Sequence, residues 1–339
     1  MTRSKLRIIY LVSFLVFLSL SVTVSAQNTQ IKGFVAASAF LEDDKFSFGI
    51  GEQDLFITSQ LNDNFSFLGE TVFKYSPNSA TQFDVSVERI IISYNYKGNH
   101  SALLGKHHTP THYWNDTYHH GRVFFPTIDR PLMFAANTFP IHTTGLAMTG
   151  LNLGNLRFGY NLMVGNGIGS SDVVDNDTYK SITAAATLKP WKKLHLGASF
   201  YHDIISEGAT DHGQIIPEKI NQQLYTATIA NFGSRFEVLA EATLTANKAE
   251  STGTVNAFAT YIYTGWKIND KFVPYLRYDL LNYSDKEIFY QNNNDRSSIL
   301  VGFRYEISYL IVAKIEFQHF DSDNAGSRDL LNAQIAIGF

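Results

Sequence analysis

The chain has 339 residues, of which 45% are hydrophobic and 14% aromatic, with a formal net charge of −4 and no cysteine. The lack of cysteine excludes disulfides, thiolate metal sites, a cysteine nucleophile and a lipoprotein anchor. The mild acidity comes without basic clusters, so there is no electrostatic basis for binding nucleic acid.

The first 26 residues have the three parts of a secretory signal: a basic start, an apolar run over 8–20 and a small-residue exit at Val24-Ser25-Ala26. We therefore expect a signal peptide over 1–26, cleavage after Ala26 and an exported domain over 27–339. The alternative is an N-terminal membrane anchor, but the apolar run is shorter than the roughly 20 residues that a spanning helix needs.

After residue 26, apolar and polar residues alternate with a period of two in one segment after another. Over 235–246, for example, Phe236, Val238 and Leu244 would share one face of a strand, and Glu237, Glu241 and Thr243 the other. A soluble β-sandwich shows the same alternation, so the period alone does not identify the solvent. Export, a C-terminal aromatic residue and tyrosines and phenylalanines near strand ends favour a transmembrane antiparallel β-barrel in the bacterial outer membrane, in contact with its lipid.

Counting these segments predicts an all-β barrel of about sixteen strands, near 30–41, 45–60, 63–76, 82–97, 100–107, 141–152, 155–165, 178–189, 193–203, 219–231, 234–247, 253–267, 271–283, 296–307, 309–320 and 328–339. Short joins alternate with longer polar stretches, as in barrels with short periplasmic turns and longer outer loops. Phase shifts near Gln53-Asp54 and Glu88-Arg89 indicate bulges or miscounts, so fourteen or eighteen strands stay open.

The last segment, 331–339, alternates strictly and ends on Phe339. A C-terminal aromatic residue that closes an amphipathic strand resembles the recognition signal of bacterial outer-membrane barrels. This resemblance implies that the barrel-assembly machinery is a partner and that Phe339 is part of the signal. A TonB-dependent receptor is disfavoured because there is no room for a plug domain ahead of the first strand.

One connection, 108–140, is far longer than the others and rich in aromatic residues, including Tyr113 and Trp114. Such apolar content implies packing, and in a barrel the available surface is the inner wall. Its place as the third outer loop of sixteen strands resembles the inward-folded constriction loop of trimeric general porins, which implies a homotrimer. The runs Gly105-Lys106-His107-His108-Thr109-Pro110, Tyr113-Trp114-Asn115, Tyr118-His119-His120-Gly121 and Asp129-Arg130-Pro131 also resemble segments of porin-like barrels from Bacteroidetes.

A constriction selects solutes by its width and by the charges that line it. The candidate constriction residues are Asp116, Arg122, Asp129 and Arg130 on the loop and Arg89, Arg157, Arg235, Arg277 and Arg304 on the wall. Both signs of charge are available, since glutamates and aspartates share the inward face with these arginines, so we expect weak ion selectivity. The alternative for each arginine is ordinary solvation inside a wet barrel.

Five histidines fall within fourteen residues: His107, His108, His112, His119 and His120. Imidazole is a common metal ligand, but this spacing matches no standard site. Hydrogen bonding of loop to wall is the simpler interpretation, and we expect no metal and no cofactor.

These expectations together predict an outer-membrane porin, a passive diffusion channel for small hydrophilic solutes or ions. One alternative is a sugar- or anion-specific channel in which the loop aromatics stack on sugar rings, and another is a non-conducting adhesin or scaffold. Catalysis is disfavoured, because His202 and Asp203 are neighbours on a predicted strand and would point to opposite faces. We therefore expect no enzyme activity.

Overall fold

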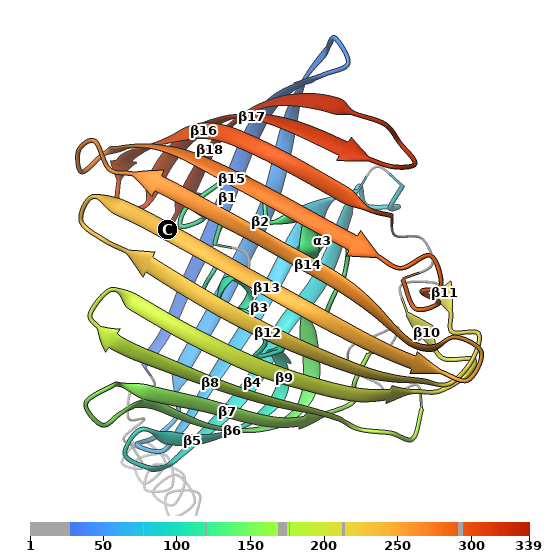
Figure 1. Ribbon diagram of the computed structural model, residues 1–339. Coiled ribbons are helices and arrows are strands. Elements are labelled where there is room, and N and C mark those ends of the chain that lie inside the picture. The colour runs from blue at the N-terminus through green and yellow to red at the C-terminus, as the bar shows by residue number, and fades with distance from the viewer. Residues whose placement is uncertain are drawn as a thin grey trace, which may run out of the picture.

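The structure is a computed structural model that describes residues 28–76, 78–118, 121–168, 175, 177–211, 214–290 and 294–339. Within these residues, sixteen of the eighteen strands form one closed antiparallel barrel (Figure 1). Each barrel strand pairs with the next one along the chain, and β1 pairs with β18 to close the ring. The predicted all-β barrel of about sixteen strands is confirmed, whereas the predicted signal peptide lies outside the described residues.

The barrel strands are β1 (Asn28–Glu42), β2 (Lys45–Gln60), β3 (Phe65–Tyr75), β4 (Phe83–Lys97), β5 (His100–His108), β6 (His142–Leu153), β7 (Phe158–Gly165), β8 (Ser181–Trp191), β9 (Leu194–Ile205), β12 (Ile220–Phe232), β13 (Phe236–Ala249), β14 (Gly253–Trp266), β15 (Phe272–Tyr283), β16 (Arg296–Ser308), β17 (Ile311–Ser322) and β18 (Arg328–Gly338). A small sheet of β10 (Thr210–Asp211) and β11 (Gln214–Ile215) lies between β9 and β12. Two short helices, α2 (Tyr113–Thr117) and α3 (Leu132–Ala135), lie between β5 and β6. Among the described residues, no helix is long and apolar enough to cross a membrane.

The alternation read from the sequence separates an outer from an inner face. On β13, Phe236 is 61% exposed, whereas Glu237, Glu241 and Thr243 are buried. Because successive side chains of a strand point to opposite faces, the apolar set covers the outside of the ring and the polar set its interior. This arrangement suits an apolar solvent outside and water inside.

Both predicted phase shifts are irregularities of strand pairing. On β4, the pair Glu70↔Arg89 is followed by Thr71↔Val87, so Glu88 is the extra residue of a bulge. A second shift lies where β1 pairs with β2, beside Gln53. Each bulge adds one residue to one strand. The inward and outward positions in the sequence therefore shift by one residue there, which is the break in the period of two. On β4 the bulge also points the Glu88 carboxylate towards the His142 Nε2 atom, 3.1 Å away.

The connections at the two ends of the barrel differ, with short turns on the left of Figure 1 and most of the longer loops on the right. The alternation is not complete, because the loop-side connections 43–44 and 250–252 are as short as the turns. Asp43 and Asp44 have φ values of 48° and 61°, which fit a two-residue hairpin turn.

At the end with the short turns, the last residue of the chain takes part in closing the ring. Phe339 and Gly33 exchange two backbone hydrogen bonds of 2.9 and 3.0 Å. A Cβ atom on Gly33 would lie 2.5 Å from the Phe339 ring, so this position requires glycine. The part of Phe339 in barrel assembly stays a prediction.

Candidate functional site

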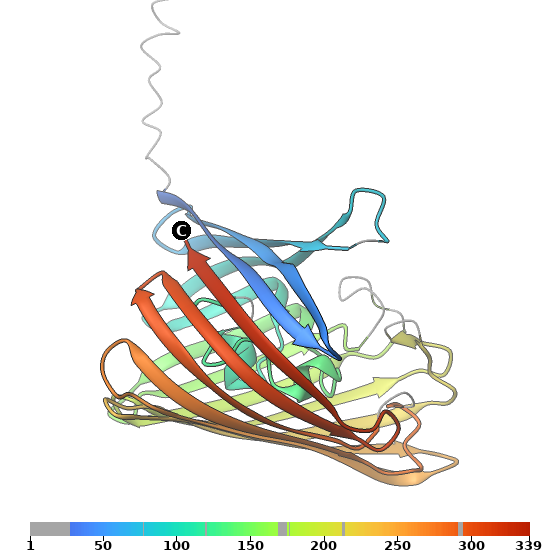
Figure 2. The same ribbon diagram turned by 90° about the horizontal axis from the view of Figure 1, so that it is seen from above.

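The connection between β5 and β6, hereafter the 109–141 segment, contacts side chains of the inner wall. Figures 1 and 2 show its helices between opposite walls of the barrel. Three wall carboxylates accept backbone N–H groups of the segment: Glu241 on β13 from Tyr113 and Trp114, Asp279 on β15 from Leu132, and Glu316 on β17 from Ile128. Since the first N–H groups of a helix lack partners within the helix, carboxylates at the starts of α2 and α3 satisfy them.

Glu241 is the most heavily used of these acceptors. Its Oε1 accepts the N–H of Tyr113 at 2.6 Å and the Thr228 hydroxyl at 2.7 Å. Its Oε2 accepts the N–H of Trp114 at 3.1 Å and the Tyr261 hydroxyl at 2.6 Å. Four donors on a buried carboxylate fix the position of α2 against β13 and β14.

Wall cations bind backbone carbonyls of the same segment. Arg277 on β15 donates to the Asp129 carbonyl at 2.7 Å and to the Asp279 carboxylate at 2.8 Å. Arg304 on β16 donates to the Pro126 carbonyl at 3.4 Å and to the Glu237 carboxylate of β13 at 3.0 Å. Lys314 on β17 donates to the carbonyls of Arg122 and Thr127, at 2.7 and 3.0 Å. The wall thus satisfies carbonyl groups of the segment that have no regular secondary structure to satisfy them.

The segment also brings its own apolar core. Trp114 and Phe125 are 0% exposed, and Phe134 and Phe139 are 3% exposed. Trp114 packs edge-on against Tyr261 of β14, with ring centroids 5.9 Å apart. Trp114 thus contacts a ring of the wall, and Tyr113 packs against His195 and Phe232.

His112 joins the segment to the wall beside this core. Its Nε2 atom lies 2.7 Å from the Thr243 hydroxyl and its Nδ1 atom 2.9 Å from the Thr111 hydroxyl. The ring stacks on Phe139 with centroids 3.8 Å apart. Burial lowers the pKa of His112 from 6.5 to about 3, so the imidazole is neutral at pH 7.

Acidification is therefore expected to loosen the 109–141 segment. Because the pKa of His112 is lowered in the folded protein, its neutral ring stabilises the fold fully above pH 6.5, and this stabilisation is lost as the pH falls from 6.5 towards 3. At pH 4 the loss is about 3 kcal/mol. The wall carboxylate Glu241 accepts the N–H groups of the next two residues, Tyr113 and Trp114.

Denaturant unfolding of the refolded protein at pH 7 and pH 4 measures this loss. The His112→Gln variant should show a smaller change between the two pH values. The outward-facing His202→Gln variant is the matched control and should keep the full change. An equal pH dependence in all three proteins would contradict the assignment to His112.

Two of the other histidines named from the sequence lie in the part of the chain that the structure describes. His107 and His108 are the last residues of β5, and His119 and His120 lie outside the described residues. Among the residues that the structure describes, no three potential ligand side chains converge. His112 is hydrogen-bonded to the wall through Thr243.

His202 and Asp203 also lie as the strand pattern predicts. Asp203 is buried on the inner face and accepts the Tyr201 hydroxyl at 2.9 Å, whereas His202 stacks with Phe200 on the other face. The two side chains therefore do not form a local dyad.

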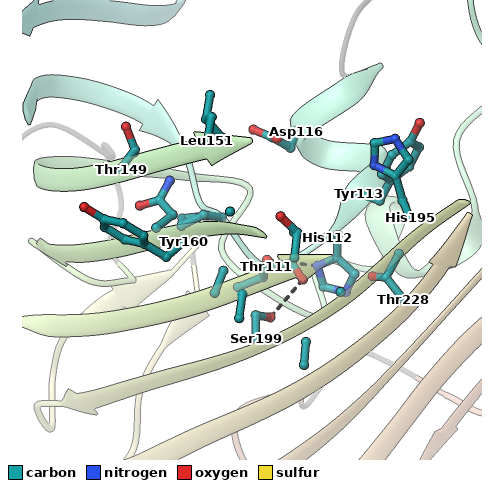
Figure 3. A pocket seen from close by; sticks show the side chains of 18 of the residues that line it. Thr111, His112, Tyr113, Asp116, Thr149, Leu151, Tyr160, His195, Ser199 and Thr228 are labelled. Carbon is teal, nitrogen blue, oxygen red and sulfur yellow. Dashed lines mark hydrogen bonds between the residues drawn. The ribbon is translucent and has the colours of Figure 1, made fainter. Parts of the chain in front are cut away.

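A cavity of about 450 Å³ lies between the segment and the inner face of β4 to β9 and β12 (Figure 3). Its wall is rich in hydroxyl groups, from Ser93, Ser101, Thr149, Thr187, Ser199 and Thr228. The charged side chains in its lining are Asp116 of the segment and Lys189 of β8, and Tyr113 and His195 lie together at one side. A second cavity of about 440 Å³ along β1 to β5 shares Ser93 and Leu103 with it.

Asp116 is exposed to the first cavity although the barrel encloses it. This enclosure raises the pKa of the Asp116 carboxyl, and the positive charges of Arg89 and Lys189 oppose the rise. Opposite charges thus face the same space from the segment and from the wall.

Three more predicted constriction residues, Arg122, Asp129 and Arg130, belong to the segment itself. Arg122 donates to Asp129 at 2.8 Å and lies 3.7 Å from Glu52 of β2. Arg130 is half-buried beside them, and its carbonyl is 3.4 Å from a guanidinium nitrogen of Arg277. On the wall, Arg89 of β4 is ion-paired with Glu70 of β3.

The remaining four predicted arginines do not face the open space. Arg277 and Arg304 are 1% and 7% exposed, because the segment covers them. Arg157 and Arg235 lie in short turns, outside the strands to which the sequence assigned them. Lys189 was missed because the run Lys189-Pro190 indicates a turn, whereas β8 extends to Trp191.

Comparison with known proteins places this geometry in a fold class. No family model and no curated protein match the chain. OmpT, an outer membrane protein of Vibrio cholerae, matches with a TM-score of 0.64 and 13% identity, over 93% of this chain and 98% of that chain. An anion-selective porin from Comamonas acidovorans matches with a TM-score of 0.64 and 13% identity, over 92% of this chain and 100% of that chain.

The outer membrane channel DcaP of Acinetobacter baumannii gives a TM-score of 0.63 and 12% identity, over 94% of this chain and 99% of that chain. Another similar structure is a trimer form of OmpT, with a TM-score of 0.63 and 12% identity over 93% of this chain and 100% of that chain. At these identities the likeness shows the fold, which is the closed sixteen-stranded barrel of outer-membrane porins. The Bacteroidetes-type resemblance stays a prediction.

Proposed function

We propose that the chain is a passive diffusion pore of the bacterial outer membrane for small hydrophilic solutes. The observation that carries the proposal is the hydroxyl-lined cavity beside the 109–141 segment, inside a barrel with an apolar outer face. Export through the signal peptide, insertion by the barrel-assembly machinery and assembly as a homotrimer belong to the same proposal. No step of diffusion requires a catalytic residue or a cofactor.

The 109–141 segment is proposed to set the width of this pore. Its wall contacts run along β13 to β17, through Glu241, Asp279 and Glu316. The space beside β4 to β9 stays open, so solutes would pass between that wall and the segment. A segment bound by hydrogen bonds at three strands gives a constriction of fixed size rather than a mobile one.

The uptake of neutral sugars by vesicles tests the proposed pore independently of ion conduction. Vesicles that contain the refolded protein should swell in small neutral sugars, and the swelling rate should fall steeply with sugar size. The outcome against the proposal is a barrel that inserts but admits none of these sugars.

Ion selectivity is expected to be weak, because Asp116 and Lys189 face the same cavity with opposite charges. The reversal potential in a salt gradient should stay near zero. Asp116→Asn should shift it towards anion preference and Lys189→Gln towards cation preference. A preference of about tenfold for either sign in the unaltered protein would contradict this assignment.

A sugar-specific channel is the second candidate. Tyr113 lines the cavity, packs edge-on against His195 at 5.2 Å and lies parallel to Phe232 at 6.4 Å, so aromatic faces are present where a solute would pass. Block of the ion current by micromolar to millimolar maltooligosaccharide, reduced in Tyr113→Ala, would favour this candidate over the general pore.

A further inference from the structure

Five consecutive short turns of the barrel carry the same pair of residues. Each has a basic residue next to an exposed aromatic one: Tyr96-Lys97, Arg157-Phe158, Trp191-Lys192, Arg235-Phe236 and Trp266-Lys267. These turns join β4 to β5, β6 to β7, β8 to β9, β12 to β13 and β14 to β15. The other two short turns, 61–64 and 309–310, contain no lysine or arginine. The pattern therefore forms one continuous arc from β4 to β15, hereafter the basic arc.

The aromatic side chains of the basic arc point out of the barrel. Trp266 pairs with Phe236 across β14 and β13, and they are 55% and 61% exposed. Trp191, opposite Leu194 of β9, is 70% exposed. Tryptophan at this level, where strands end, suits the boundary between hydrocarbon and headgroups, because the ring is apolar and its N–H is polar.

The basic side chains of the arc are largely unneutralised. The five turns, counted together with Lys97 at the end of β4, contain one acidic residue, Asp270. They contain seven basic residues: Lys97, Arg157, Lys192, Lys193, Arg235, Lys267 and Lys271. Lys267 pairs with Glu237 at 3.1 Å. The exposed side chains of Arg157, Lys192, Lys193 and Arg235 form no ion pair with any described residue.

The opposite end of the barrel has the reverse charge. Apart from the 109–141 segment, its connections hold twelve acidic described residues, Asp43, Asp44, Asp175, Asp177, Glu207, Asp211, Glu218, Glu250, Asp285, Glu287, Asp295 and Asp323, against three basic ones, Lys180, Lys219 and Lys286. A general excess of basic residues therefore does not explain the arc.

We propose that the basic arc binds the phosphate groups of anionic phospholipids in the leaflet that faces the short turns. Exposed aromatic rings would hold the turns at the headgroup level, and the adjacent lysines and arginines would contact the phosphates. The inference shares with the proposed function the placement of the barrel in a membrane, but it does not require conduction.

Lipid selectivity can be read from the protein's own tryptophans. The chain has three: Trp191 and Trp266 lie in the arc, and Trp114 is 0% exposed inside the barrel and gives a constant background. The protein is reconstituted in equal parts of phosphatidylglycerol and phosphatidylcholine, with brominated acyl chains on one lipid or on the other. Brominated phosphatidylglycerol should quench about twofold more strongly at 0.1 M salt, and the difference should shrink at 1 M salt, where the Debye length is about 3 Å.

Two matched variants locate the effect. In the first variant, which combines Lys192→Gln, Lys193→Gln and Arg235→Gln, the two brominated lipids should quench the tryptophan fluorescence equally. The second variant makes the same charge change at the opposite end with Lys45→Gln, Lys248→Gln and Lys286→Gln. It should keep the stronger quenching by phosphatidylglycerol. Equal quenching in the unaltered protein, or loss of preference only in the second variant, would overturn the inference. Since quenching needs insertion alone, a non-conducting barrel that still prefers phosphatidylglycerol would disprove the pore and leave this inference standing.

Discussion

Glu241→Ala is expected to give larger and noisier single-channel steps than the unaltered protein. The substitution removes the acceptor for the N–H groups of Tyr113 and Trp114 and leaves the Tyr261 hydroxyl buried without its partner. Hydrogen bonds to a buried carboxylate stabilise by about 1.5–3 kcal/mol each, so the attachment of α2 weakens by about 3 kcal/mol or more. The start of the 109–141 segment should then leave the wall for part of the time.

The control for this prediction is Asp270→Ala, which removes a carboxylate from an exposed turn. Its conductance should equal that of the unaltered protein. Glu241→Gln keeps one acceptor oxygen, so its conductance should lie between those of the control and of Glu241→Ala. If Glu241→Ala conducted as the control does, with an unchanged noise level, the segment would not be held by Glu241.

Arg277→Met is expected to destabilise the protein by about 3–5 kcal/mol, because it leaves the buried Asp279 carboxylate without its cation. Arg277 is 1% exposed and also donates to Thr127 and to the Asp129 carbonyl, so the middle of the segment loses its attachment as well. Denaturant unfolding in detergent micelles, followed by tryptophan fluorescence, measures the loss.

Arg235→Met is the matched control. It makes the same substitution at the other kind of position, because the sequence assigned both arginines to the constriction but only Arg277 is buried. Arg235 is exposed in a turn, and its replacement should change stability by less than about 0.5 kcal/mol. Equal losses in the two variants would mean that burial under the segment does not determine the role of Arg277.

Sequence reasoning succeeded for the barrel because a strand has a short, local signal. A period of two is visible within one segment, and β13 shows the predicted faces. The two bulges were visible for the same reason, as breaks in that period. The great length and aromatic content of 108–140 likewise indicated packing without any knowledge of its partner.

The partners of the segment could not be predicted, because they are far away in the chain. Glu241 lies 128 residues from Tyr113, and Glu316 lies 188 residues from Ile128. The period of two shows that a side chain points into the barrel. It does not show whether the 109–141 segment covers that part of the inner wall or leaves it open to the cavity. Arg277 and Arg304 were therefore assigned to the pore although the segment covers them.

Arg157 and Arg235 were misplaced for a different reason. The predicted strands 155–165 and 234–247 begin two or three residues before the observed β7 and β13, so both arginines were given a strand position that they lack. Arg157 has a φ of 47°, which belongs to a turn. Here these errors assigned to the interior of the barrel two residues that lie at its rim.

The most direct test of the account is the single-channel conductance of the refolded protein in a planar bilayer, with and without deletion of residues 112–134. We expect discrete steps in the intact protein and clearly larger steps after deletion, because the segment contacts the inner wall at three strands and narrows the open space. Silence of both proteins, after insertion has been verified, would contradict a pore constricted by the 109–141 segment.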